Sequence, residues 1–194
     1  MPGKGARPLS TSPEILYTPD DLFAMPDGDH YELVDGRLVE RNMGIWAVHV
    51  ATRLTLMIGQ FDPAQRLGWL LNSDASYQAF PNGKIRKPDL SFIRLGRLPG
   101  ERAPVAYIQL APDLAVEVIS PNDVHDQTDQ KVDEYLKAGV RLVWVVNPEV
   151  RTVLIYRADG SIIGVRESGE LDGEDVLPGF RCAVAGLFAT PQAP

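Results

Sequence analysis

Apolar residues recur along the chain with two periods, one typical of amphipathic helices and one typical of buried strands. Between residues 46 and 60 they return every three or four positions, which predicts a long helix. A second helix is predicted over residues 124–138, because Gly139 follows it as a helix-ending residue. A short helix is expected after Thr18, where a capping hydroxyl precedes a proline and two acidic residues.

Five short segments have the length and composition of β-strands. Residues 114–119 and 140–146 are almost continuously apolar, as strands buried on both faces are. Strands are also expected at residues 68–71, 76–80 and 89–95. From the long helix onward, the predicted order is therefore a helix, three strand regions, a second helix and a further strand.

Two β-hairpins are predicted at the ends of this core. Residues 31–39 surround Asp35 and Gly36, a dipeptide that favours a tight hairpin turn. Residues 151–157 and 161–166 form the second hairpin, which turns through Gly160. Exposed edge strands in this second hairpin would suit pairing between two copies of the chain, so a homodimer is one expected assembly.

Length and composition favour one domain. The 194 residues are 44% apolar, enough for a sizeable core, and we expect a single domain over residues 14–190. Residues 1–13 are rich in Pro, Gly and Ser and are expected to form a disordered tail. No apolar run approaches the roughly 18–20 residues of a membrane span, so no membrane association is expected. The single cysteine, Cys182, excludes an intramolecular disulfide and favours a reducing cytoplasm as the compartment.

Charge is unevenly distributed along the chain. The net charge of −7 argues against a protein that coats nucleic acid by bulk attraction. Six basic residues nevertheless lie between residues 84 and 102, and six acidic residues lie between residues 117 and 134. A basic strip beside an acidic pocket suits a site that binds a metal ion and a phosphate, and Lys84, Arg86 and Lys87 are its candidate contacts to nucleic acid. The plainer alternative is two solvated faces of opposite charge.

Two carboxylates stand where the pattern predicts buried strands. Asp89 opens one apolar segment and Glu117 lies inside the next, and a carboxylate is costly to bury unless its charge is compensated. Divalent metal ions provide such compensation through oxygen ligands. Lys131 follows on the second long helix. Structural alternatives remain for each: Asp89 could cap the turn after Pro88, Glu117 could pair with Lys131, and Lys131 could be solvated.

Several short motifs follow one another along the chain: Tyr31-Glu32-Leu33-Val34-Asp35-Gly36, His49, Pro88-Asp89, Glu117-Val118-Ile119-Ser120-Pro121, Lys131-Val132-Asp133-Glu134-Tyr135, Gly139-Val140 and Trp144-Val145-Val146-Asn147-Pro148. In this order they resemble the Uma-two family of bacterial restriction-endonuclease-like proteins. The resemblance runs from about residue 18 to residue 188, nearly the whole chain.

The resemblance implies a fold and a set of site residues. The fold is the α/β, restriction-endonuclease-like fold of PD-(D/E)XK nucleases, an αβββαβ core with a mixed central sheet, which agrees with the order of elements predicted above. The resemblance also implies that Asp89 and Glu117 are catalytic and that Glu32 and His49 lie at the rim of the pocket.

The chain departs from the usual nuclease pattern at one position. The lysine that such enzymes place two residues after the glutamate is Ile119 here. Lys131, on the following helix, is the expected substitute.

These residues lead to two hypotheses of different classes. The first is a Mg²⁺- or Mn²⁺-dependent endonuclease that hydrolyses DNA, with the ion held by Asp89, Glu117 and the backbone carbonyl of Val118 or Ile119. In this hypothesis Lys131 orients or deprotonates the attacking water, or neutralises the phosphate. The second is a catalytically inactive binding or assembly protein of a mobile-element or defence locus, favoured by the missing strand lysine and the acidic net charge.

Overall fold

The computed structural model describes residues 15–41, 43–120 and 125–191. The tail expected at residues 1–13 lies outside the described residues. None of the helices in the described part of the chain is long and apolar enough to cross a bilayer.

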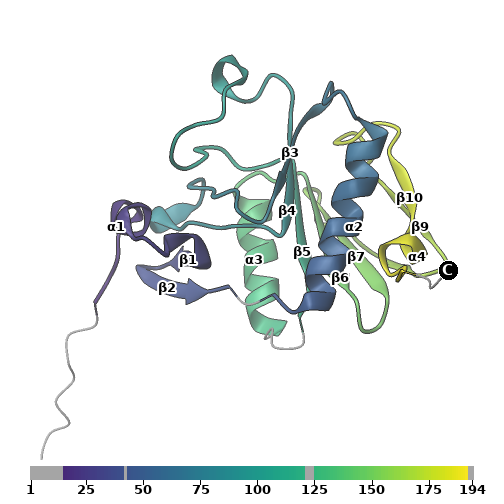
Figure 1. The fold of residues 1–194 in the computed structure, drawn as a ribbon, viewed down its shortest axis with the longest axis horizontal. Coiled ribbons are helices and arrows are strands. Elements are labelled where there is room, and N and C mark those ends of the chain that lie inside the picture. Colours follow the sequence, from purple (N-terminus) through teal and green to yellow (C-terminus); the bar gives the residue numbers. More distant parts are fainter. Residues whose placement is uncertain (1–14, 42, 121–124, 192–194) are drawn as a thin grey trace, which may run out of the picture.

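A six-stranded mixed sheet forms the centre of the protein (Figure 1). Its strands lie side by side in chain order, and only β5 and β6 run parallel, because helix α3 connects them as a crossover. The mixed sheet predicted from the sequence is therefore confirmed. The strands are β3 (Gly68–Asn72), β4 (Leu90–Arg94), β5 (Leu114–Val118), β6 (Leu142–Asn147), β7 (Thr152–Arg157) and β8 (Ile162–Arg166).

Helices cover the two faces of this sheet (Figure 1). Helix α2 (Ile45–Phe61) packs on one face together with α4 (Val184–Leu187) and a small hairpin, β9 (Glu170–Asp172) and β10 (Arg181–Ala183). Helix α3 (His125–Lys137) packs on the other face. The order α2-β3-β4-β5-α3-β6 is the predicted αβββαβ core.

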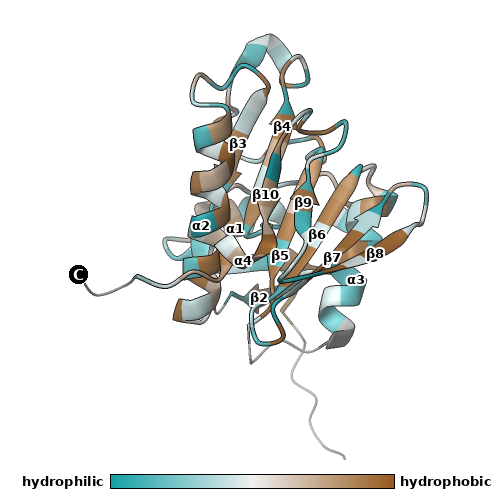
Figure 2. Cartoon of the chain, turned by 90° about the vertical axis from the view of Figure 1, so that its right-hand side faces the viewer, coloured by the Kyte–Doolittle hydropathy of each residue, from teal (hydrophilic) through white to brown (hydrophobic). Residues whose placement is uncertain are grey.

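Side chains along the central strands point alternately to the two faces of the sheet, so each face has its own apolar core. Leu114, Val116 and Val118 of β5 pack toward α2, whereas Ala115 packs toward α3. Trp144 of β6 is fully buried on the α2 side, as expected for a core residue. In Figure 2 the central strands are largely brown, which shows how apolar their sequences are.

One predicted strand is absent. Residues 76–80 do not form a strand, because only Tyr77 makes backbone bridges, to Arg86 and Ile108. Its apolar neighbour Phe80 instead packs its ring edge-on to Tyr135 of α3, with 5.7 Å between ring centroids. Burial under a helix therefore accounts for the apolar residues of this segment.

An N-terminal unit packs beside the sheet end at which β5 stops (Figure 1). It contains α1 (Pro19–Ala24) and the hairpin of β1 (Tyr31–Val34) and β2 (Arg37–Glu40). The Asp35 and Gly36 turn residues both have positive φ, as the predicted tight turn requires. Backbone hydrogen bonds between Leu33 and Ile85 tie this hairpin to the segment that leads into β4. Short 3-10 turns lie at Gly28–His30, Pro81–Gly83 and Pro99–Glu101.

Strand β8 forms one edge of the central sheet. Ile162 and Ile163 on this strand are both exposed. These features suit the expected pairing of two copies, and the homodimer stays a prediction.

Candidate active site

Asp89 and Glu117 are brought together by strand register. Leu90 of β4 lies opposite Val116 of β5, so the residue before Leu90 and the residue after Val116 are cross-strand neighbours. Both carboxylates lie on the face covered by α3, and each residue is less than one-tenth exposed. The two acidic residues singled out in the sequence therefore meet in one place.

Helix α3 supplies two partners for Glu117. The Lys131 ammonium lies 3.1 Å from Glu117 Oε2, and the Tyr135 hydroxyl donates a 2.5 Å hydrogen bond to Glu117 Oε1. The two residues are four positions apart and so share one face of the helix. Both carboxylate oxygens of Glu117 are thus oriented by α3, and Lys131 is part of the pocket instead of a solvated surface lysine.

Asp89 is held by a backbone donor and by an arginine from outside the sheet. The Val118 N–H donates to Asp89 Oδ2 at 2.8 Å, and the Arg41 guanidinium lies 3.4 Å from Asp89 Oδ1. Burial, with the negative charge of Glu117, raises the pKa of Asp89 to about 7 despite the Val118 hydrogen bond. The carboxylate of Asp89 is therefore poorly compensated by the groups around it.

Glu32 of β1 completes the acidic group. Its carboxylate contacts the Lys131 ammonium at 3.4 Å, the Arg86 guanidinium at 3.0 Å and the Lys87 backbone N–H at 2.8 Å. Burial opposes ionisation of Glu32, but the charges of Lys131 and Arg86 outweigh it and lower the pKa. Glu32 is therefore an ionised residue in the lining of the cavity. The resemblance had implied a position at the rim of the pocket.

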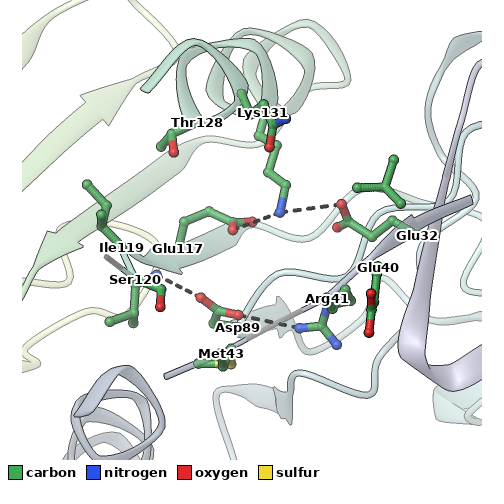
Figure 3. Close-up of a pocket in the computed structure, with 13 residues that line it drawn as sticks. Glu32, Glu40, Arg41, Met43, Asp89, Glu117, Ile119, Ser120, Thr128 and Lys131 are labelled. Atoms are coloured by element: carbon green, nitrogen blue, oxygen red, sulfur yellow. Dashed lines mark hydrogen bonds and ion pairs between the residues drawn. The ribbon is translucent and has the colours of Figure 1, made fainter. Parts of the chain in front are cut away.

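Lys131 carries a full positive charge in this setting. Burial alone would lower its pKa, but the charges of Glu117, Glu32 and Asp89 exceed that effect and raise the pKa above the ordinary lysine value. Figure 3 shows the ammonium between Glu117 and Glu32. Lys131 is thus a cation at neutral pH.

These side chains line a cavity of about 90 Å³ between the β1–β2 hairpin, the end of β5 and α3. Figure 3 shows Lys131 at one side of the cavity and Arg41 at the other, with the two carboxylates between them. Its lining also includes Val118, Ile119 and Ser120 at the end of β5. This space is of the size of a phosphate group or of an ion with a few waters.

The expected basic strip has a different role from the one predicted. Lys84 pairs with Glu134 at 2.6 Å, and Arg86 pairs with both Glu134 and Glu32. Lys87 is 2% exposed and its ammonium contacts the Gly28 and Asp29 carbonyls. The three cations are buried and satisfied within the protein, so they do not form an exposed surface for DNA.

His49 does not lie at the pocket rim. It is on α2, where its ring stacks on Trp46 and its Nε2 atom lies 2.9 Å from the Ala189 carbonyl oxygen. That position is on the opposite face of the sheet from Glu117, because α2 and α3 pack on opposite faces. The contacts of His49 are those of a structural residue that joins α2 to the C-terminal segment.

Two residues of the site were not among the candidates predicted from the sequence. Tyr135 could have been found from its helical spacing to Lys131. Arg41 could not, because it reaches Asp89 only through the packing of the β1–β2 hairpin. Its second anchor, the Ser73 carbonyl at 2.8 Å, also comes from a distant part of the chain.

The donor set suits a hydrated divalent cation. Asp89 and Glu117 provide two carboxylates on the wall of one cavity, and the high pKa of Asp89 shows that a further positive charge would be favourable there. Among residues 15–41, 43–120 and 125–191, no three Asp, Glu, His or Cys side chains are grouped to hold an ion alone. Mg²⁺ typically binds one or two carboxylates and keeps several waters, so two are sufficient.

We expect substitution of Arg86 by Met to destabilise the fold strongly. Arg86 is 4% exposed and lies between Glu32 and Glu134, so its loss removes one counter-charge from each of two buried carboxylates. Breaking a buried ion pair in this way costs about 3–5 kcal/mol. Urea unfolding measures the loss, and Arg151→Met, which removes an exposed pair with Glu167, should change stability by about 1 kcal/mol or less. Equal effects of the two substitutions would contradict the prediction.

Comparison with known proteins identifies the family. The sequence profile of the Uma2 family, described as "Putative restriction endonuclease", matches residues 19–185. A crystal structure of "a putative nuclease belonging to DUF820" from Anabaena variabilis ATCC 29413 is 19% identical, with a TM-score of 0.75, covering 88% of this chain and 97% of that one. This likeness confirms the predicted nuclease-like fold. No curated protein matches the chain. Because the profile match extends over most of its length, the chain belongs to the Uma2 family.

Proposed function

We propose that this protein is a divalent-metal-dependent endonuclease that hydrolyses phosphodiester bonds in DNA. The observation that carries the proposal is the convergence of Asp89, Glu117 and Lys131 in one cavity. Buried ion pairs contribute little net stability, so two adjacent buried carboxylates are poorly explained as structural groups. Family membership supports nucleic acid as the substrate.

The proposed roles follow from the positions of the residues. Asp89 and Glu117 would hold Mg²⁺ or Mn²⁺, with the carbonyl of Val118 as a backbone ligand. When bound, such an ion lowers the pKa of water and offsets negative charge on the phosphate. Tyr135 fixes the orientation of Glu117 through its hydroxyl hydrogen bond.

The charge state of Lys131 narrows the roles considered for it. A lysine with a raised pKa holds its proton at neutral pH and is a poor general base. Its ammonium can donate hydrogen bonds to an attacking water or to a phosphate oxygen. We therefore assign Lys131 to positioning the water and neutralising the phosphate. Because Lys131 lies in the cavity, the absence of a lysine at position 119 is a weaker argument for an inactive protein.

The test measures metal binding and cleavage on the full chain. Wild-type protein should bind Mg²⁺ or Mn²⁺ by calorimetry, should melt at higher temperature in millimolar metal, and should nick supercoiled plasmid until EDTA is added. A wild type whose melting temperature ignores both metals and which nicks nothing would refute the proposal. That result would favour the inactive binding or assembly protein.

The stabilising effect of Mg²⁺ should increase with pH. The pKa of Asp89 is raised from its ordinary value of 3.8 to about 7 in the fold, so its protonated form favours folding and its stability contribution is lost as pH rises toward 7. Ionised Asp89 is also the form that binds metal. The melting-temperature gain in Mg²⁺ should therefore be larger at about pH 8 than at about pH 5. Asp89→Asn should remove this difference, and a gain that is independent of pH in wild type would contradict it.

A further inference from the structure

Arg41 has two anchors of unequal strength. Its guanidinium donates to the Ser73 carbonyl at 2.8 Å, within the usual range of hydrogen bonds. Its contact with Asp89 Oδ1 is 3.4 Å, beyond that range. Arg41 is therefore fixed by Ser73 and only loosely engaged with Asp89.

The contact with Asp89 places Arg41 in competition with a metal ion. Asp89 Oδ2 accepts a close hydrogen bond from the Val118 N–H, whereas the contact of Oδ1 with Arg41 is long, so Oδ1 is the oxygen more open to a further partner. Two positive groups at the same oxygen repel each other in a poorly solvated cavity. Binding of an ion to Asp89 would therefore weaken the Arg41 contact, while the Ser73 hydrogen bond still holds the guanidinium at the cavity wall.

The guanidinium has the chemistry to bind a phosphate from that position. Arginine has five N–H donors in a planar fork that matches two phosphate oxygens. The hydrogen bonds to Ser73 and Asp89 each use one N–H, from Nη1 and Nη2, and each of these nitrogens has a second N–H that can donate. Arg41 also lines the cavity, where a phosphate would lie. Figure 3 shows Arg41 across the cavity from Lys131, so a phosphate between them would meet positive charge from two sides.

We propose that Arg41 acts as a replaceable counter-cation: it pairs loosely with Asp89 in the metal-free protein and transfers to a substrate phosphate when metal occupies Asp89. This inference rests on the proposed function. It assigns Arg41 a direct contact with substrate and predicts opposite effects of its loss on metal binding and on nucleic-acid binding.

The test compares Arg41→Met with wild type in two separate measurements. Calorimetry with Mg²⁺ alone, at alkaline pH, should show several-fold tighter metal binding by the variant, because the competing cation is gone. Affinity for a short DNA duplex in Ca²⁺, and nicking in Mg²⁺, should both fall by roughly tenfold or more. Arg41→Lys keeps the charge without the planar fork and should restore wild-type metal affinity more fully than DNA affinity.

Arg181→Met is the matched control, because Arg181 also forms an arginine–aspartate pair, with Asp172 at 2.8 Å on the β9–β10 hairpin. It should change neither measurement. Weaker Mg²⁺ binding by a folded Arg41→Met, or unchanged DNA affinity, would overturn the role of Arg41 while leaving the endonuclease proposal intact. If Arg41→Met unfolds, weaker Mg²⁺ binding by Arg41→Lys than by wild type overturns it instead. A wild type that binds no metal and nicks no plasmid would refute the proposed function itself.

Discussion

Substitution of Glu117 by Gln is expected to abolish plasmid nicking and the metal-induced rise in melting temperature together. The cavity has two carboxylates from the sheet, Asp89 and Glu117, so neutralising either removes half of their negative charge and should weaken Mg²⁺ binding until millimolar metal no longer stabilises the fold. The amide preserves the shape of the side chain and can still accept the Tyr135 hydrogen bond. The effect therefore isolates the charge. Asp89→Asn should give the same result.

A buried carboxylate outside the cavity provides the control. Asp113 is 2% exposed and pairs with Arg97 at 2.9 Å near the opposite end of β5. Asp113→Asn should lower stability but keep the response to metal. A Glu117→Gln protein that still gains stability in Mg²⁺ would show that the ion binds elsewhere.

Substitution of Lys131 by Ala is expected to separate cleavage from metal binding. The ammonium contacts Glu117 and Glu32 but is not itself a metal ligand, so metal binding should survive. The cleavage rate should fall by roughly 10²–10³-fold, the range for loss of one hydrogen-bond donor that stabilises developing negative charge. Single-turnover nicking at saturating metal measures the rate, and calorimetry measures the affinity.

Lys137 allows a comparison on the same helix. Its side chain is 72% exposed and pairs with Asp133. Lys137→Ala should leave both the rate and the metal affinity unchanged. If Lys131→Ala cleaves as fast as wild type, another group supplies the positive charge. The proposal that Lys131 takes the place of the usual strand lysine would then be wrong.

The sequence predicted the parts of the site that depend on strand periodicity. Asp89 and Glu117 could be found because one opens an apolar segment and the other lies inside the next, and paired strands then bring them together through local register. Lys131 and Tyr135 follow from helical spacing once the β5–α3–β6 crossover is predicted. Such features can be predicted because they depend only on elements that are neighbours in the chain.

The errors arose where side chains meet across distant parts of the chain. A count of charges between residues 84 and 102 could not show that Lys84 and Arg86 pair with Glu134 of α3. His49 has helical spacing, but periodicity does not reveal which face of the sheet its helix covers. The position of Arg41 depends on how the β1–β2 hairpin packs against the rest of the protein, and the local sequence pattern does not predict that packing.

The location of the lysine on α3 makes the chemistry of the site depend on the hydrophobic core. A lysine on β5 would have its distance to Glu117 fixed by the repeat of the strand itself. Here that distance depends on how the helix sits on the sheet, through apolar residues such as Val132, which is 4% exposed. Substitutions that move the helix by a fraction of an ångström can therefore adjust reactivity without touching the cavity. In the proposed endonuclease, the residues that tune the cleavage rate need not be polar.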